Sequence, residues 1–415
     1  MKFSVQNVKN GCRLGLITDL GKNGSKSIET PMCMLYTRGG NAPHLTLDVL
    51  KKIQRVPPIA HMYLSSLAEH SEAVSQFKEG IANFCGMQDY AVYCSLHDPA
   101  TEVPSGYNEK SGTAIWTKGG KYKLDVNHFM QIQEAFQPDI CEALYDGDTN
   151  KDSTRKRLLK AMDRTLNYLD EIQDKWKSSQ KLQKTALFGV IEGGFSVQER
   201  QKSAHETVTR NVDGFVLAGF HNNGPKTETF DFSQVTEICQ KTMECLPENK
   251  PRLMQNAWRP DKVMEGIALG IDMFDSSYPY IVTERGCGLV FRFNICASTE
   301  EQKGNGDHLL GFQINLADKK YVDDFGPLLE GCTCYACQNF TRSYINHLLN
   351  TSELLSSVLL MIHNFHHYFE FFHQIRQCLQ DGSFDKLNSL IQNQKPVDSF
   401  DKLNSLIPIQ KPEDS

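Results

Sequence analysis

The sequence lacks the features that mark exported, membrane-spanning or broadly nucleic-acid-binding proteins. Its first residues, MKFSVQNVKNGCRLG, mix polar and apolar side chains without the apolar core of a signal peptide, so export is not expected. The longest apolar stretch, 354–362, is interrupted by serines and is far shorter than the ~18 residues of a membrane span. Lys and Arg number 44 against 50 Asp and Glu, and the formal net charge of −6 excludes a basic nucleic-acid arm.

The composition is that of a folded globular chain, with 40% hydrophobic and 23% charged residues among 415. Barrels of the α/β class run past ~250 residues as one unit, so we expect one large domain with an appendage. The chain has 13 cysteines. In a protein that is not exported, these indicate reduced thiols and metal ligands rather than disulfides.

Short apolar runs alternate with helical patterns along most of the chain. Residues 159–176 place apolar side chains three or four positions apart, which is the spacing of a helix with one buried face. Several runs are continuously hydrophobic, as expected of parallel strands covered on both faces. The alternation predicts an α/β fold, and its repeat count fits a closed (β/α)8 TIM-type barrel. The runs are 58–62, 90–96, 140–145, 187–191, 215–218 and 271–274.

Polar residues gather just past four of these runs. In a parallel barrel such C-terminal strand ends form the active face. Ordinary turns and helix caps use the same residue types, so the pattern alone leaves both interpretations open. The segments are SLHD at 95–98, DGD at 146–148, EGG at 192–194 and DSS at 275–277.

A tandem repeat ends the sequence, because residues 383–398 recur almost unchanged as 399–414. Two copies are too few for a solenoid. Phe384, Leu387 and Ile391, with Leu390, could line one face of a short helix, whereas prolines interrupt its continuation. We expect a duplicated, weakly ordered tail.

Three cysteines within six residues, Cys332, Cys334 and Cys337, give the strongest chemical signal. Such thiolates can take three corners of a tetrahedral zinc site, although buried free thiols are an alternative. A fourth protein ligand would make the site structural. Water at the fourth position would leave it open, as in a zinc hydrolase. Spacing does not choose among the histidines that follow, which are His347, His363, His366, His367 and His373.

The cysteine segment and several others resemble tRNA-guanine transglycosylases. GCTCYACQNFTRSYINHLL at 331–349, followed by LLMIHN at 359–364, is similar to that family's zinc subdomain, and GVIEGG at 189–194 and GIDMFD at 270–275 are similar to its barrel motifs. The resemblance implies one structural zinc ion held by Cys332, Cys334, Cys337 and His363. It also implies a barrel over 1–330, a zinc-binding subdomain with closing helices over 331–382, and the repeat tail over 383–415.

The family exchanges bases in tRNA: a carboxylate attacks the ribose C1′, guanine leaves, and a deazaguanine base enters. The resemblance places Asp275 at the nucleophile position and Asp146 at that of a base-holding aspartate. Other positions depart from the family. Ser95 stands where a second catalytic aspartate is expected, Glu192 replaces a base-reading glutamine, and Phe220 is expected to crowd the base pocket.

These departures resemble a non-catalytic branch of the family. The resemblance implies a subunit that pairs with a catalytic subunit, or with a second copy of itself, and supports exchange of guanine for queuine at the wobble position of G-U-N anticodon tRNAs. It also implies residence in the cytoplasm and on the cytoplasmic side of the outer mitochondrial membrane. The alternative is a self-sufficient transglycosylase, in which Asp275 attacks and His97 or Asp98 replaces the missing acid/base.

Contact with tRNA would require a local basic patch, since the overall charge is negative. A solvated surface is an equally good interpretation of each candidate. The candidates are Lys118, Lys121 and Lys123, the run 155–157 (RKR), and Arg342.

Overall fold

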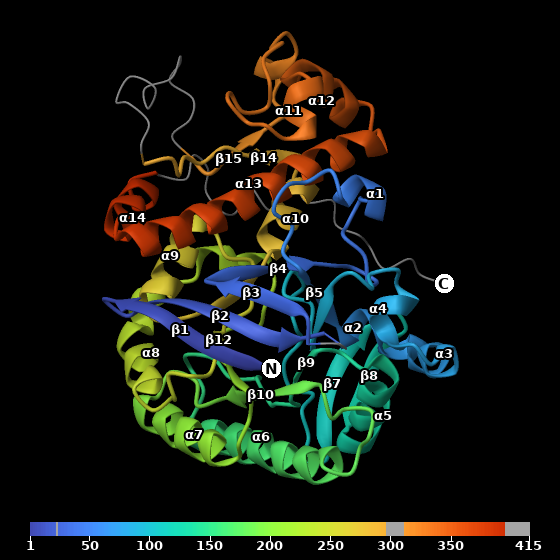
Figure 1. Ribbon diagram of the computed structural model, residues 1–415, viewed down its shortest axis with the longest axis vertical. Helices are drawn as coiled ribbons and strands as arrows, with labels where there is room; N and C mark the ends of the chain where they lie inside the picture. The colour runs from blue at the N-terminus through green and yellow to red at the C-terminus, as the bar shows by residue number, and fades with distance from the viewer. Residues whose placement is uncertain (22–23, 296–310, 395–415) are drawn as a thin grey trace.

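Eight parallel strands close into a barrel that is ringed by helices (Figure 1). The computed structural model describes residues 1–21, 24–295 and 311–394. Each barrel strand pairs with the next one along the chain, and the last pairs with the first, which confirms the predicted fold class. The barrel strands are β4 (Met32–Tyr36), β5 (Ile59–Tyr63), β6 (Ala91–Ser95), β9 (Ile140–Glu142), β10 (Ala186–Ile191), β11 (Gly214–Leu217), β12 (Arg252–Leu253) and β13 (Met273–Asp275).

Helices follow the barrel strands and cover them from outside. Helix α6 illustrates why these segments form helices that cover the strands. Thr154 caps its first turn, and its apolar stripe is buried while its other face is exposed. The helices of the barrel are α1 (Leu47–Leu50), α2 (Leu64–Leu67), α3 (Ser71–Phe77), α4 (Gly80–Phe84), α5 (Val126–Phe136), α6 (Arg155–Trp176), α7 (Val197–Thr209), α8 (Thr236–Met243), α9 (Pro260–Ala268) and α10 (Ser277–Glu284).

Two barrel strands and the three accessory sheets of the described chain were not foreseen from the sequence. The six predicted runs became β5, β6, β9, β10, β11 and β13, whereas β4 and the two-residue β12 were missed. An antiparallel sheet of β1 (Lys2–Lys9), β2 (Cys12–Leu20) and β3 (Lys26–Thr30) precedes the barrel, and a hairpin of β7 (Gly112–Thr117) and β8 (Gly120–Asp125) follows β6.

The N-terminal sheet seals one end of the barrel. Phe3, Ile17 and Ile28 of this sheet belong to the same buried cluster as Met32 and Ile59, the first residues of β4 and β5. Because this end holds the strand starts, a functional site of the barrel is expected at the opposite end, where polar residues follow the strands.

A second layer lies across the barrel at the top of Figure 1. Helix α13 (Leu354–Asp381) packs on the barrel core along most of its length, while Leu359 and Leu360 join a separate apolar cluster. That cluster comes from β15 (Gln313–Asn315), α11 (Tyr335–Asn339), α12 (Arg342–Asn350) and the loops around them. We call these elements, together with β14 (Cys287–Leu289), the metal layer. None of the helices in the described ranges combines the length and apolarity needed to cross a membrane.

The first copy of the tandem repeat differs from the expected weakly ordered tail. It forms α14 (Phe384–Gln392), in which Phe384, Leu387 and Ile391 are buried, and α14 packs against α9 and α13. The short helix that the hydrophobic spacing suggested is therefore present in the first copy. The second copy, 399–414, lies outside the described residues.

Candidate metal centre and barrel mouth

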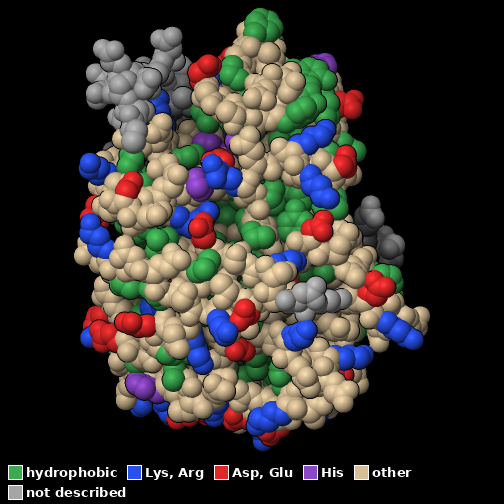
Figure 2. Space-filling model, viewed as in Figure 1, with side chains coloured by type: hydrophobic (Ala, Val, Ile, Leu, Met, Phe, Trp, Pro, Cys, Tyr) green, Lys and Arg blue, Asp and Glu red, His purple; other side chains and the backbone are tan. Residues whose placement is uncertain are grey.

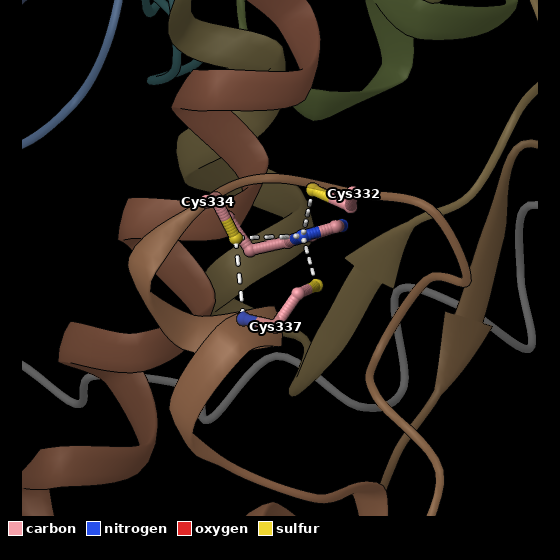
Figure 3. Close-up of side chains that lie close together, drawn as sticks. Cys332, Cys334 and Cys337 are labelled. Atoms are coloured by element: carbon pink, nitrogen blue, oxygen red, sulfur yellow. Dashed lines mark hydrogen bonds between the residues drawn. The ribbon is translucent and has the colours of Figure 1, made fainter.

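The three cysteines of the C-x-C-x2-C cluster converge on one histidine (Figure 3). Cys332 precedes α11, Cys334 caps its first turn, and Cys337 lies within it, while His363 comes from α13. Nδ1 of His363 lies 3.7, 3.5 and 3.3 Å from the three sulfur atoms in that order. The four ligand atoms all lie within 4.8 Å of one another.

The geometry fits a tetrahedral zinc ion. Zinc bonds to sulfur at about 2.3 Å and to imidazole nitrogen at about 2.0 Å, which places sulfur and nitrogen roughly 3.5 Å apart across a tetrahedral centre. Nε2 of His363 donates to the carbonyl of Leu289 at 2.7 Å, so Nδ1 carries the lone pair that faces the sulfurs. Four protein atoms would close such a site, and this argues against the open position of a hydrolase.

The other histidines have different partners or positions. His367 contacts the carbonyl of Phe291 at 2.9 Å, and His366 lies 3.4 Å from the hydroxyl of Thr333. His347 is exposed on α12. The neighbour of His363, Asn364, donates to the carbonyl of Cys287 and accepts from the Leu289 amide, so α13 is fastened to β14 directly beside the four ligands.

At the barrel mouth, Asp275 ends β13 but is sealed from solvent. Its side chain is fully buried, and its two oxygens accept hydrogen bonds from the backbone amides of Asn256 and Ser277. Burial raises the pKa of Asp275 to about 7, although these hydrogen bonds lower it. A carboxyl in this state is partly protonated at neutral pH and has no open path to a ribose.

Among the described residues, a serine occupies the second catalytic position, and the nearby carboxylate of Asp98 is engaged by other groups of the chain. Ser95 ends β6, and its Oγ lies 2.7 Å from Nε2 of His61. Both side chains are buried. Asp98 accepts hydrogen bonds from Tyr36 and from the turn that follows it, at 2.8 and 2.9 Å. Burial lowers the pKa of His97 to about 4, so this imidazole is neutral near pH 7.

Asp146, the expected base holder, has no acceptor position left. It accepts one hydrogen bond from Asn108, two from Arg157 and one from Arg164, at 2.6 to 3.1 Å. A carboxylate offers about four lone-pair positions, and these donors occupy all of them. Burial alone would raise the pKa of Asp146, but the bonds from the two arginines outweigh it and hold the pKa below its usual value.

Glu192 is a buried carboxyl whose oxygens receive no hydrogen bond from the described residues. Burial raises its pKa to about 8, with Arg200 opposing the shift and Asp146 adding to it. A β-carbon at Gly219 would lie 2.1 Å from one Glu192 oxygen, so this carboxyl fits only because residue 219 has no side chain.

The remaining cavity at this point of the mouth is about 50 Å³, lined by His97, Tyr145, Gly219, His221 and Gln255 among others. Small-molecule sites typically enclose about 300 to 1,000 Å³, a size that this cavity does not reach, whereas the adjoining cavity lined by Tyr63, His97, Asp98 and Tyr280 measures about 690 Å³. Phe220 was expected from the sequence to crowd the base pocket, and this expectation was wrong. Phe220 does not line the cavity but packs on the Arg200 guanidinium, whose carbon lies 3.6 Å from its ring centre.

The candidate phosphate contacts are mostly engaged within the chain. Lys123 pairs with Glu109 at 2.7 Å, and Lys121 lies over the ring of Tyr107. Arg155, Arg157 and Arg342 pair with Glu199, Asp146 and Asp324. The run 155–157 had suggested a basic surface patch. Its last residue, Arg157, instead donates hydrogen bonds to Asp146, as Arg164 does. Lys118 and Lys156 are exposed.

Comparison with known proteins adds an independent finding. The family model described as Queuine tRNA-ribosyltransferase matches residues 9–396. The chain is 44% identical to Queuine tRNA-ribosyltransferase accessory subunit 2 of Homo sapiens over 418 residues, covering 95% of this chain and 100% of the relative. It is 42% identical to the protein of the same name from Xenopus tropicalis, with the same coverage, and 39% identical to that from Ixodes scapularis, covering 94% and 100%.

Proposed function

We infer that this chain, which belongs to the queuine tRNA-ribosyltransferase family, is a non-catalytic subunit of the enzyme. In this role it supports assembly of the complex and placement of the tRNA for base exchange. Its partner would be a catalytic subunit, as the name accessory subunit 2 of the relatives suggests. The exchange supported would be that of guanine for queuine at the wobble position of G-U-N anticodon tRNAs.

The enclosure of Asp275 is the observation that carries this proposal. Covalent base exchange needs an ionised nucleophile in contact with C1′ and a second acid/base group for the departing base. Here Asp275, the carboxylate at the nucleophile position, is fully buried and accepts hydrogen bonds from two backbone amides. Ser95 stands where the second catalytic aspartate is expected. The filled acceptor positions of Asp146 leave no group there to hold the base.

A structural zinc ion is part of the proposal. It would be held by Cys332, Cys334, Cys337 and His363, whose spacing fits a tetrahedral centre. The ion would fasten α11 to α13, and α13 in turn packs on the barrel. In this chain the metal would therefore support the shape of the metal layer rather than take part in chemistry.

The metal layer, together with the start of α13, is also the surface that we propose for the partner subunit. Six of the ten large hydrophobic side chains that are exposed in the described part of the chain belong to residues 322–355. Figure 2 shows hydrophobic side chains gathered over α12 and the start of α13. Contiguous exposed apolar surface of this kind marks protein–protein interfaces. The residues are Val322, Phe325, Tyr335, Tyr344, Leu354 and Leu355.

The exchange assay tests the proposal directly. Labelled guanine release from a queuine-accepting tRNA is measured with this chain alone, with the catalytic subunit alone, and with the co-purified mixture. We expect activity only in the mixture, and we expect Asp275→Asn in this chain to leave the mixture's rate within about twofold. A self-sufficient transglycosylase predicts turnover by the lone chain and its loss in Asp275→Asn. Particle mass distinguishes a heterodimer from a homodimer.

We expect weak binding of tRNA by the chain alone, because most of its candidate cations pair with carboxylates of the same chain. Titration of labelled tRNA at several salt concentrations measures both the affinity and the number of phosphate contacts. Nanomolar affinity of the lone chain at physiological salt would contradict the expectation. The assembled complex is the matched comparison.

Residence in the cytoplasm, and at the cytoplasmic side of the outer mitochondrial membrane, is proposed from the family resemblance. Fractionation of cells that express the tagged chain with its partner tests it. Recovery from inside protease-protected organelles would contradict the proposal.

A further inference from the structure

Helix α14 occupies a well-defined seat on the molecule. Leu387 and Ile391 are fully buried and Phe384 is nearly so, and the helix packs against α9 and α13. The end of this segment is fixed by polar contacts. Gln392 donates to the carbonyl of Asp261, and Gln394 exchanges two hydrogen bonds of 2.7 Å with the backbone of Arg292. We call this set of contacts the α14 seat.

The sequence contains a second segment with the same contact residues. Sixteen positions later, the nine residues of 383–391 (SFDKLNSLI) recur unchanged as 399–407. Phe400, Leu403 and Ile407 thus repeat the three buried side chains, and Gln410 repeats Gln394. The copies differ only in Gln392/Pro408, Asn393/Ile409 and Val397/Glu413.

We propose that the second copy exchanges with the first in the α14 seat, so that either copy can complete the fold. The apolar contacts of the seat depend on side chains that are identical in the two copies. The seat therefore cannot discriminate between them through these contacts. When the second copy is seated, residues 383–398 become the linker from Gly382 to the helix.

Two differences make the first copy the preferred occupant. Pro408 corresponds to Gln392, the last residue of α14, and a proline there removes a backbone donor and the side-chain bond to Asp261. Seating the second copy also closes a 16-residue loop, a cost that grows only slowly with length. The exchange is thus biased toward the first copy, and a substitution in either copy can shift it.

Hydrogen–deuterium exchange of the full chain, followed by mass spectrometry, tests the proposal. Peptides from the two copies are distinguishable because the residues after each nonapeptide differ. In the unsubstituted chain, we expect protection in 384–392. In Leu387→Asp, we expect protection to move to 400–407, with exchange there slowed at least about tenfold. Melting of this variant should fall only part of the way to that of Leu387→Asp/Leu403→Asp.

Two matched variants complete the experiment. Leu403→Asp alone should leave melting unchanged, because the first copy remains intact. Pro408→Gln, which does not alter the first copy, should increase protection of 400–407 in an otherwise unchanged chain. The proposal is overturned if Leu387→Asp melts like the double variant and 400–407 stays unprotected in both Leu387→Asp and Pro408→Gln. It is also overturned if protection of 400–407 appears only in a concentration-dependent dimer, since the exchange would then be between chains.

Discussion

Replacement of Cys334 by alanine is expected to unfold the metal layer and to abolish pairing with the catalytic subunit. The sulfur of Cys334 lies 3.5 Å from Nδ1 of His363 and also accepts the backbone amide of Cys337, so its loss removes a ligand and a helix cap together. Metal-binding free energy is folding free energy in such sites. We expect the free energy of unfolding to fall by about 4 kcal/mol or more, because loss of a metal site is among the mechanisms behind the largest effects of single substitutions.

Denaturant unfolding, metal content and co-purification with the partner measure the three parts of this expectation. Cys378→Ala is the matched control, since Cys378 is a fully buried cysteine of the same helix α13 but does not belong to the ligand group. If both variants melt alike and both retain the metal and the partner, the structural role of the site is refuted.

Glu192→Gln is expected to stabilise the chain increasingly as the pH rises. The pKa of Glu192 is raised from its usual 4.5 to about 8 by burial, so the folded chain holds a proton that the unfolded chain releases between these values. The stability of the unsubstituted chain therefore declines across that window. Glutamine has nearly the same shape and never ionises, so its advantage grows from about 1 kcal/mol at pH 5 to about 4 kcal/mol at pH 8.

Unfolding curves of both chains at pH 5, 6, 7 and 8 measure this difference. Glu171→Gln, at an exposed position of α6, controls for loss of a surface charge. A constant difference between Glu192→Gln and the parent chain at all four pH values would show that Glu192 is not protonated in the folded state. The exchange rate of the assembled complex should not change, because Glu192 is enclosed in this subunit.

Local signals in the sequence predicted the parts of the structure that depend on neighbouring residues. The cysteine cluster is contiguous, so its convergence was visible, and the resemblance selected His363 from five histidines. Six barrel strands lie in the short apolar runs that the sequence showed, and several of those runs were continuously hydrophobic. Strand β12 has only two residues and begins with Arg252, so its run was too short to notice. Strand β4, MCMLY, follows β3 without a helical pattern between them to mark it as a barrel strand.

The parts that were missed depend on side chains distant in sequence. Arg164 bonds Asp146 across 18 positions, and nothing in the spacing of α6 separates an inward-reaching arginine from a solvated one. Phe220 was placed in the pocket because of its position, but the Arg200 guanidinium offers its ring a cation–π partner on the other side. Such choices are made by packing, which the linear pattern does not contain.

The four hydrogen bonds on Asp146 also bear on whether catalysis could return. A single reversion at Ser95 would restore one carboxyl, yet Asp146 would stay occupied by its two arginines and Asp275 would stay enclosed. Freeing Asp146 requires removing Arg157 and Arg164, and each removal alone leaves a buried charge less well compensated. Removing either arginine alone is thus expected to give a less stable chain without a gain in activity. The two arginine contacts on Asp146 therefore make a return to catalysis depend on several simultaneous substitutions rather than on one.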